Sequence, residues 1–142
     1  MQRNKQQKFE DLMQYLFHGT RDVNPKLIYE SKIGFDFRLS NEKGLYGSGT
    51  YFAKNSGYSN AYRYKIPDKE QYQMFVALVL TGESIKLEQT KLKAPPFKSG
   101  STQERYDSVN NGEGGHFIVY DHFRAYPGYL ITYKYYKTKR TK

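Results

Sequence analysis

The three histidines, His18, His116 and His122, are the first candidates for chemistry, because imidazole can exchange a proton near neutral pH or bind a metal. They lie far apart in the chain and form no His-x-x-x-His pair, whereas metal sites need several ligands at a fitting spacing. The chain also has no cysteine, which excludes disulfides, thiolate catalysis and cysteine-based zinc sites. We therefore expect no metal. A single histidine among aromatic residues is more often structural than catalytic.

The glycine-rich segment 44–49, Gly-Leu-Tyr-Gly-Ser-Gly, could in principle hold a phosphate. It lacks the third glycine of a dinucleotide-binding loop and the lysine of a Walker loop. The apolar run Tyr51-Phe52-Ala53 that follows indicates a strand, whereas phosphate-binding loops lead into a helix. A Rossmann site is therefore disfavoured, and composition alone favours a flexible loop.

The aromatic residues and the net charge each allow two interpretations. With 15 Tyr and 9 Phe, the chain could use tyrosines such as Tyr51, Tyr58, Tyr62 and Tyr64 either to stack on a ligand near Ser56 and Ser59 or to pack the core. The net charge of +9 favours anionic partners, including nucleic acid or acidic proteins, or simply solubility. Residues 134–142 form a basic C-terminal tail.

The elements that must position these residues form an α+β pattern, with helices first and strands dominating the second half. The 142 residues suit one domain, 1–142. No apolar run is long enough to span a membrane, and the polar start predicts no signal peptide, so we expect an intracellular protein, cytoplasmic or nuclear. The spacing of apolar and turn residues predicts helices over 5–16, 24–34 and 56–64, strands over 16–18, 51–53, 74–80, 105–109, 117–120 and 129–133, and loops over 36–49 and 86–104. We expect the strand over 74–80 to be buried on both faces.

Several segments, read in order, resemble the catalytic domain of the poly(ADP-ribose) polymerase family. They are Leu16-Phe17-His18-Gly19-Thr20, Tyr46-Gly47-Ser48-Gly49-Thr50-Tyr51-Phe52-Ala53, Ser56 with Ser59-Asn60-Ala61-Tyr62, Leu92-Lys93-Ala94-Pro95-Pro96, Tyr106-Asp107-Ser108-Val109 and Ala125-Tyr126-Pro127-Gly128-Tyr129-Leu130-Ile131-Thr132-Tyr133. The last block is most similar to tankyrases and to the mono-ADP-ribosylating, macrodomain-linked members. The resemblance implies the ADP-ribosyltransferase fold, a mostly antiparallel split β-sheet with short flanking helices and a central NAD-binding cleft.

The same resemblance implies roles for individual residues in binding NAD+, the donor of ADP-ribose. His18 would bind a hydroxyl of the adenosine ribose, and Tyr51 and Tyr62 would sandwich the nicotinamide ring. The Gly19 backbone and Ser59 would hold the carboxamide of nicotinamide, and Asn24 would lie near the adenosine. We expect further donor contacts at Thr20, Gly49 and Tyr58, and the segment 36–49 would cover the bound donor.

His116 stands where polymerising members of the family place a glutamate. A neutral imidazole lacks the fixed negative charge of that glutamate, so we expect transfer of a single ADP-ribose, with His18, Tyr51 and His116 as the catalytic set. Two alternatives stay open: Glu113 could reach the site if the strand shifted, or the domain could bind NAD+ without turnover.

A function of a different class is a nucleic-acid-binding module, which would need an exposed platform of tyrosines beside basic residues. The related RNA 2′-phosphotransferase is disfavoured, because its arginine-rich pattern is not evident. The partners we expect are NAD+ and a protein or nucleic-acid acceptor, with no membrane, and we expect a monomer. The family domain carries further elements before the His-Gly block, so the chain is either a minimal transferase or an N-terminally truncated one.

Overall fold

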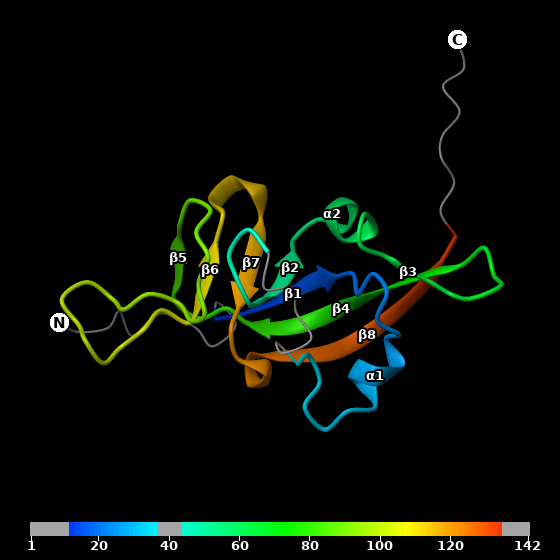
Figure 1. Cartoon of the computed structure of the whole chain (residues 1–142), viewed down its shortest axis with the longest axis horizontal. Coiled ribbons are helices and arrows are strands. Elements are labelled where there is room, and N and C mark those ends of the chain that lie inside the picture. Colours follow the sequence, from blue (N-terminus) through cyan, green and yellow to red (C-terminus); the bar gives the residue numbers. More distant parts are fainter. Residues whose placement is uncertain (1–11, 37–43, 135–142) are drawn as a thin grey trace, which may run out of the picture.

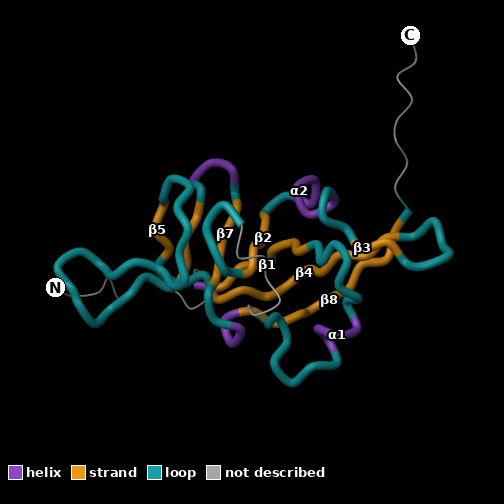
Figure 2. Tube along the Cα trace, viewed as in Figure 1, coloured by secondary structure: helices purple, strands orange, loops and turns teal. Residues whose placement is uncertain are grey.

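The computed structural model describes residues 12–36 and 44–134, and its central feature is a sheet of eight strands (Figure 1; Figure 2). The strands are β1 (Met13–His18), β2 (Thr50–Ala53), β3 (Tyr64–Lys65), β4 (Tyr72–Leu80), β5 (Ser84–Lys86), β6 (Ser108–Asn110), β7 (His116–Val119) and β8 (Ala125–Tyr133). The helices are short: α1 (Lys26–Tyr29), α2 (Ser56–Asn60) and the 3-10 turns η3 (Gly112–Gly114) and η4 (His122–Arg124). The α+β class and the mostly antiparallel sheet are confirmed.

The sheet consists of two halves that meet between β1 and β2. Its order is β3-β4-β1-β2-β7-β6-β5, with β8 also paired to β4, and only the β5–β6 pair is parallel. Six residues of β1 pair with β4, whereas β1 pairs with β2 only through Phe17 and Ala53. In Figure 1, β2 and β5–β7 therefore diverge from β1, β4 and β8 as a split sheet.

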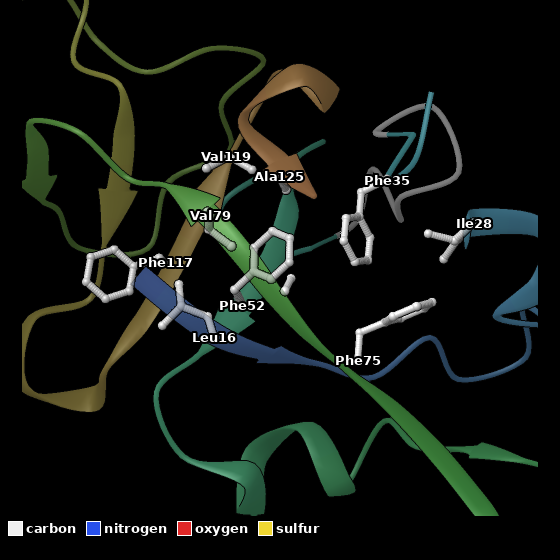
Figure 3. Close-up of a cluster of buried hydrophobic side chains, with 10 residues drawn as sticks. Leu16, Ile28, Phe35, Phe52, Phe75, Val79, Phe117, Val119 and Ala125 are labelled. Atoms are coloured by element: carbon white, nitrogen blue, oxygen red, sulfur yellow. The ribbon is translucent and has the colours of Figure 1, made fainter. Parts of the chain in front are cut away.

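The main core fills one side of the sheet where its halves meet (Figure 3). Phe35, which follows α1, packs edge-on against Phe52 of β2 and Phe75 of β4, with ring centroids 5.2 Å apart in both pairs. Offset and edge-on pairs of this kind add stabilisation beyond the burial of their area. The other buried members are Leu16, Ile28, Ala77, Val79, Phe117, Val119 and Ala125. The large phenylalanines of the sequence thus hold the two halves together.

The prediction of a helix over residues 5–16 is wrong from Met13 onward, and residues 1–11 lie outside the described part. Met13 and Leu16, two of the four apolar residues whose spacing suggested a helix, belong to strand β1, in which Leu16 is buried and Tyr15 is 62% exposed. Continuous pairing with β4 satisfies the backbone of β1 and overrides a weak local pattern. The strand predicted for residues 16–18 is confirmed as the end of β1.

Other boundaries differ because turns end the elements earlier than the apolar pattern indicated. Helix α1 covers Lys26–Tyr29 rather than 24–34, and α2 ends at Asn60 rather than 64. Strands β3 and β5 were not predicted, and β6 begins at Ser108 rather than at 105. The strand predicted over 74–80 is confirmed as the C-terminal seven residues of β4. Burial on both faces holds only in part, because Val76, Leu78 and Leu80 are half-buried, whereas the other four residues are buried. Strands β2, β7 and β8 confirm those predicted over 51–53, 117–120 and 129–133.

Removing the ring of Phe52 should cost much of the stability of the fold, because this side chain is fully buried between the two halves. We expect Phe52→Ala to lower the free energy of unfolding by about 3–5 kcal/mol, as other buried Phe→Ala changes do. Urea unfolding measures this change. Phe123→Ala, at a position 78% exposed, is the control and should change it little. Equal effects at both positions would contradict this account of the core.

Candidate functional site

A cleft of about 610 Å³ opens where the end of β1, strand β2, strand β7 and helix α2 converge. It is lined by residues from four stretches of sequence. Its lining is His18, Gly19, Thr20, Arg21, Asp22, Val23, Ile28, Phe35, Asp36, Gly44, Leu45, Tyr46, Gly49, Thr50, Tyr51, Tyr58, Ser59, Tyr62, His116 and Ile118. The cleft therefore brings together every site residue predicted from the sequence except Asn24.

His18 is held at the floor of the cleft by a hydrogen bond and by two aromatic rings. Its Nδ1 lies 2.6 Å from the carbonyl oxygen of Tyr51, and since a carbonyl only accepts, Nδ1–H is the donor. The rings of Phe35 and Phe52 pack against the imidazole with centroids 5.1 Å away in both cases. This burial lowers the pKa of His18 below its ordinary value. The ring is thus neutral at pH 7, with Nε2 left as a hydrogen-bond acceptor.

Gly19 has no space for a side chain, because its backbone lies directly against helix α2. A Cβ at this position would collide with the carbonyl oxygens of Ser59 and Tyr62. Glycine therefore lets the turn after β1 approach α2 closely. The next residue, Thr20, is buried and its hydroxyl donates to the carbonyl of Val23 at 2.7 Å, which closes the turn.

Tyr51 anchors the glycine-rich segment to the wall of the cleft. Its hydroxyl donates to the Gly47 carbonyl at 2.8 Å and accepts from the Tyr46 N–H at 2.9 Å. Tyr46 is held from the other side by the Tyr120 hydroxyl, which donates to its carbonyl at 2.6 Å. Burial raises the pKa values of all three tyrosines. The described part of this loop, residues 44–49, is thus an anchored turn and not the flexible loop that its composition favoured.

The opposite wall is a row of three rings, Tyr62, Tyr58 and His116. Tyr58 lies between the other two, with its ring centroid 5.1 Å from Tyr62 and 3.9 Å from His116. Burial, with the neighbouring Tyr62, raises the pKa of Tyr58 to about 12, and burial lowers the pKa of His116. The backbone N–H of His116 donates to Asn111 Oδ1 at 2.8 Å, which fixes the start of β7. Tyr58 and His116 are therefore uncharged at neutral pH.

The remaining residues that the sequence analysis named lie partly in the cleft and partly outside it. Ser59 is 2% exposed on α2, and Gly49 packs against Ile118 so closely that a Cβ would collide with it. Asn24 lies outside the cleft lining, where its side chain accepts from the Lys26 N–H at the start of α1. Glu113 lies in η3 and does not line the cleft, so the shifted strand that would bring it to the site is not observed.

Sequence reasoning missed two features of the lining. Arg21 follows the His-Gly-Thr motif directly, but no pattern distinguished it from a surface arginine. The role of Tyr46 as the anchored residue of the loop depends on contacts from Tyr51 and Tyr120 that only the fold reveals. Among residues 12–36 and 44–134, no group of three or more His, Asp or Glu lies close enough to hold a metal ion.

Comparison with protein families matches residues 1–113 to the poly(ADP-ribose) polymerase catalytic domain. The chain belongs to the poly(ADP-ribose) polymerase family. It is 45% identical over 120 residues to a probable poly [ADP-ribose] polymerase of Dictyostelium discoideum, covering 84% of this chain and 33% of the relative. It is 34% identical over 121 residues to human protein mono-ADP-ribosyltransferase PARP12 and 36% over 125 residues to mouse PARP10. These matches cover 83% and 85% of this chain but 16% and 13% of the relatives, so the chain spans a third or less of their lengths.

The family membership confirms the resemblance inferred from the sequence, including the likeness to mono-ADP-ribosylating members. The family match ends before His116, so it leaves the role of this residue open. In the part of the chain that the structure describes, no helix has the length and apolar character needed to cross a membrane.

Removal of the Tyr51 hydroxyl should release the glycine-rich turn from the poly(ADP-ribose) polymerase cleft. Tyr51→Phe leaves the Tyr46 N–H and the Gly47 carbonyl without their partner, at a cost of about 1–3 kcal/mol. We expect faster hydrogen exchange of the Tyr46 amide, measured by NMR. Tyr129→Phe, at a position 64% exposed, is the matched control. Unchanged protection of the Tyr46 amide would rule out this anchoring role.

The burial of His18 should make the stability of the domain depend on pH. Its folded pKa lies below the ordinary 6.5, so between these two values the unfolded chain binds a proton that the folded chain does not. The free energy of unfolding therefore falls as pH drops below 6.5 and is independent of His18 well above that value. His116, whose pKa burial also lowers, acts in the same direction.

We expect His18→Gln to flatten part of this slope in urea unfolding between about pH 7.5 and about pH 5. Phe123→Ala, at the exposed position used above as a control, removes no titrating group and should retain the full slope. If the two variants lose stability with the same slope on acidification, His18 is not the titrating group.

Proposed function

We propose that this chain transfers a single ADP-ribose unit from NAD+ to an acceptor, releasing nicotinamide. The observation that carries the proposal is the convergence of His18, Gly19, Tyr51, Ser59 and Tyr62 in one cleft of about 610 Å³. This volume suits a large part of a dinucleotide. Family membership and the mono-ADP-ribosyltransferase relatives support the same reaction.

The reaction breaks the bond between nicotinamide and its ribose and passes through a cationic, oxocarbenium-like sugar. In the proposed complex, Tyr51 and Tyr62 stack on the nicotinamide ring, while the Gly19 backbone and Ser59 hold its carboxamide. The neutral His18 accepts a hydrogen bond at Nε2 from a ribose hydroxyl, because its Nδ1–H is already bonded to Tyr51. These contacts accelerate the reaction by positioning the donor and excluding water from the bond that breaks.

The chemistry of His116 favours transfer of one unit over chain growth. Elongation requires a hydroxyl of the previous ADP-ribose to be polarised by a negative group, and a neutral imidazole carries no such charge. Burial lowers the pKa of His116, so the ring stays uncharged at pH 7 and does not repel the developing cation. The nucleophile must then supply its own reactivity, as a carboxylate side chain of a protein acceptor does.

A nucleic-acid acceptor is a second candidate, favoured by the net charge of +9 and by an exposed pair of tyrosines. Tyr15 and Tyr129 are 62% and 64% exposed, and their ring centroids lie 6.4 Å apart on the face of the sheet opposite the core. Such rings could stack on unpaired bases. We further propose that the domain acts as a monomer inside the cell, in the cytoplasm or nucleus.

The test is incubation of the purified protein with NAD+ and with protein or oligonucleotide acceptors, followed by mass spectrometry. We expect adducts of one ADP-ribose on a protein and free nicotinamide in equal amount. Adducts on the oligonucleotide alone would favour the second candidate. Binding of NAD+ without nicotinamide release would instead identify a domain that binds the donor but does not turn it over, and long polymers would exclude the proposed outcome.

Replacement of His116 tests the assignment of this position. We expect His116→Glu to extend the product beyond one unit, because it restores a fixed negative charge near the acceptor. His116→Gln, which adds no charge, should leave single adducts as the product. Gel electrophoresis of products labelled from radioactive NAD+ separates the two cases. If neither variant changes product length, His116 does not control elongation.

A further inference from the structure

Arg21 is the sole lysine or arginine among the described residues that line the cleft, which also contains the carboxylates of Asp22 and Asp36. NAD+ carries two negative charges on its diphosphate. An anion that leaves water for a partly enclosed site requires a compensating cation or hydrogen-bond donors. Because the lining has two carboxylates and a single cation, the position of Arg21 is important for any diphosphate that enters the cleft.

The backbone places Arg21 in an unusual conformation directly after the His-Gly-Thr motif. Its φ of 53° lies in the left-handed region, which costs a non-glycine residue about 1 kcal/mol or more. A hydrogen bond from its N–H to the Tyr62 carbonyl, 2.7 Å long, holds this conformation. Such local strain clusters at sites that bind ligands. In this conformation Arg21 lines the cleft.

The guanidinium of Arg21 lies over the ring of Tyr62, with its central carbon 4.8 Å from the ring centroid. Its charge also acts on Tyr58, where it opposes the rise of the pKa caused mainly by burial. Within the described ranges of the chain, Arg21 forms no ion pair, and the residue as a whole is exposed. The head group is therefore accessible, charged and held at the mouth of the site.

We propose that Arg21 binds the diphosphate of NAD+, leaving the face of Tyr62 to form a two-pronged contact with the phosphate oxygens. The inference rests on the proposed function, which places the adenosine ribose at His18 and the nicotinamide at Tyr62. The diphosphate joins these two ends of the donor. Arg21 belongs to the turn that begins after His18 and contacts Tyr62 through the Arg21 N–H. The planar guanidinium matches phosphate geometry better than the point charge of lysine does.

The test compares two ligands that share the nicotinamide ring but differ in the diphosphate. Calorimetry measures the dissociation constants of NAD+ and of free nicotinamide for the wild type, Arg21→Gln and Arg21→Lys. We expect Arg21→Gln to weaken NAD+ binding roughly ten- to hundredfold, and to leave nicotinamide binding nearly unchanged. Arg21→Lys should recover part of the loss. The affinity of the wild type for NAD+ should fall with added salt more steeply than that of Arg21→Gln.

Arg63→Gln is the matched control, because Arg63 also lies over a tyrosine, 4.5 Å from the centroid of Tyr72, but outside the cleft lining. It should bind both ligands as the wild type does. An equal loss of NAD+ and nicotinamide binding in Arg21→Gln would show that Arg21 only supports Tyr62, and would overturn the inference. Unchanged NAD+ binding would overturn it as well. A wild type that binds no NAD+ would instead refute the proposed function, which separates the two failures.

Discussion

The hydrogen bond from His18 Nδ1–H to the Tyr51 carbonyl is the interaction on which both the fold and the cleft depend. It lies where strands β1 and β2 meet, beside the single register pair of Phe17 and Ala53 that joins the two halves of the sheet. The bond adds a contact at the weakest seam of the sheet and also fixes the tautomer of the imidazole. Any separation of the halves would therefore displace the ring of His18 and the wall formed by Tyr51 together.

The elements that could be predicted well from the sequence are strands that are themselves continuous apolar runs. Strands β2, β4 and β7 were found because their interior residues are apolar whatever the partner strand. The first half of strand β1 was mistaken for a helix because its identity depends on pairing with β4, which lies far along the chain. The lengths of the two short helices were overestimated for a related reason, since turns against the sheet set where each helix ends.

That the predicted site residues lie together in one cleft could be foreseen only through the order of the motifs, and their roles stay predictions. The spacing of single residues such as His18 or Tyr62 does not distinguish them from core residues. They converge because turns bring the end of β1 against α2. Gly19 illustrates this dependence, because the need for glycine arises from carbonyl oxygens of Ser59 and Tyr62 that lie elsewhere in the sequence. Arg21 was missed because its orientation comes from a left-handed backbone torsion that no residue pattern encodes.

If His116 occupies the third catalytic position, as we propose, the charges around it in the cleft are compatible with transfer. Tyr58 and His116 are uncharged at neutral pH, and the tyrosine rings of the wall that they form with Tyr62 present π-faces, which attract a positive centre. On the proposed mechanism, the developing sugar cation thus meets polarisable rings instead of a carboxylate, while the fixed cation, Arg21, remains with the diphosphate. Since position 116 supplies no carboxylate, the negative charge at that side of the sugar would come with the acceptor. This requirement would make the acceptor part of the catalytic site, because the rate would depend on which nucleophile approaches the sugar.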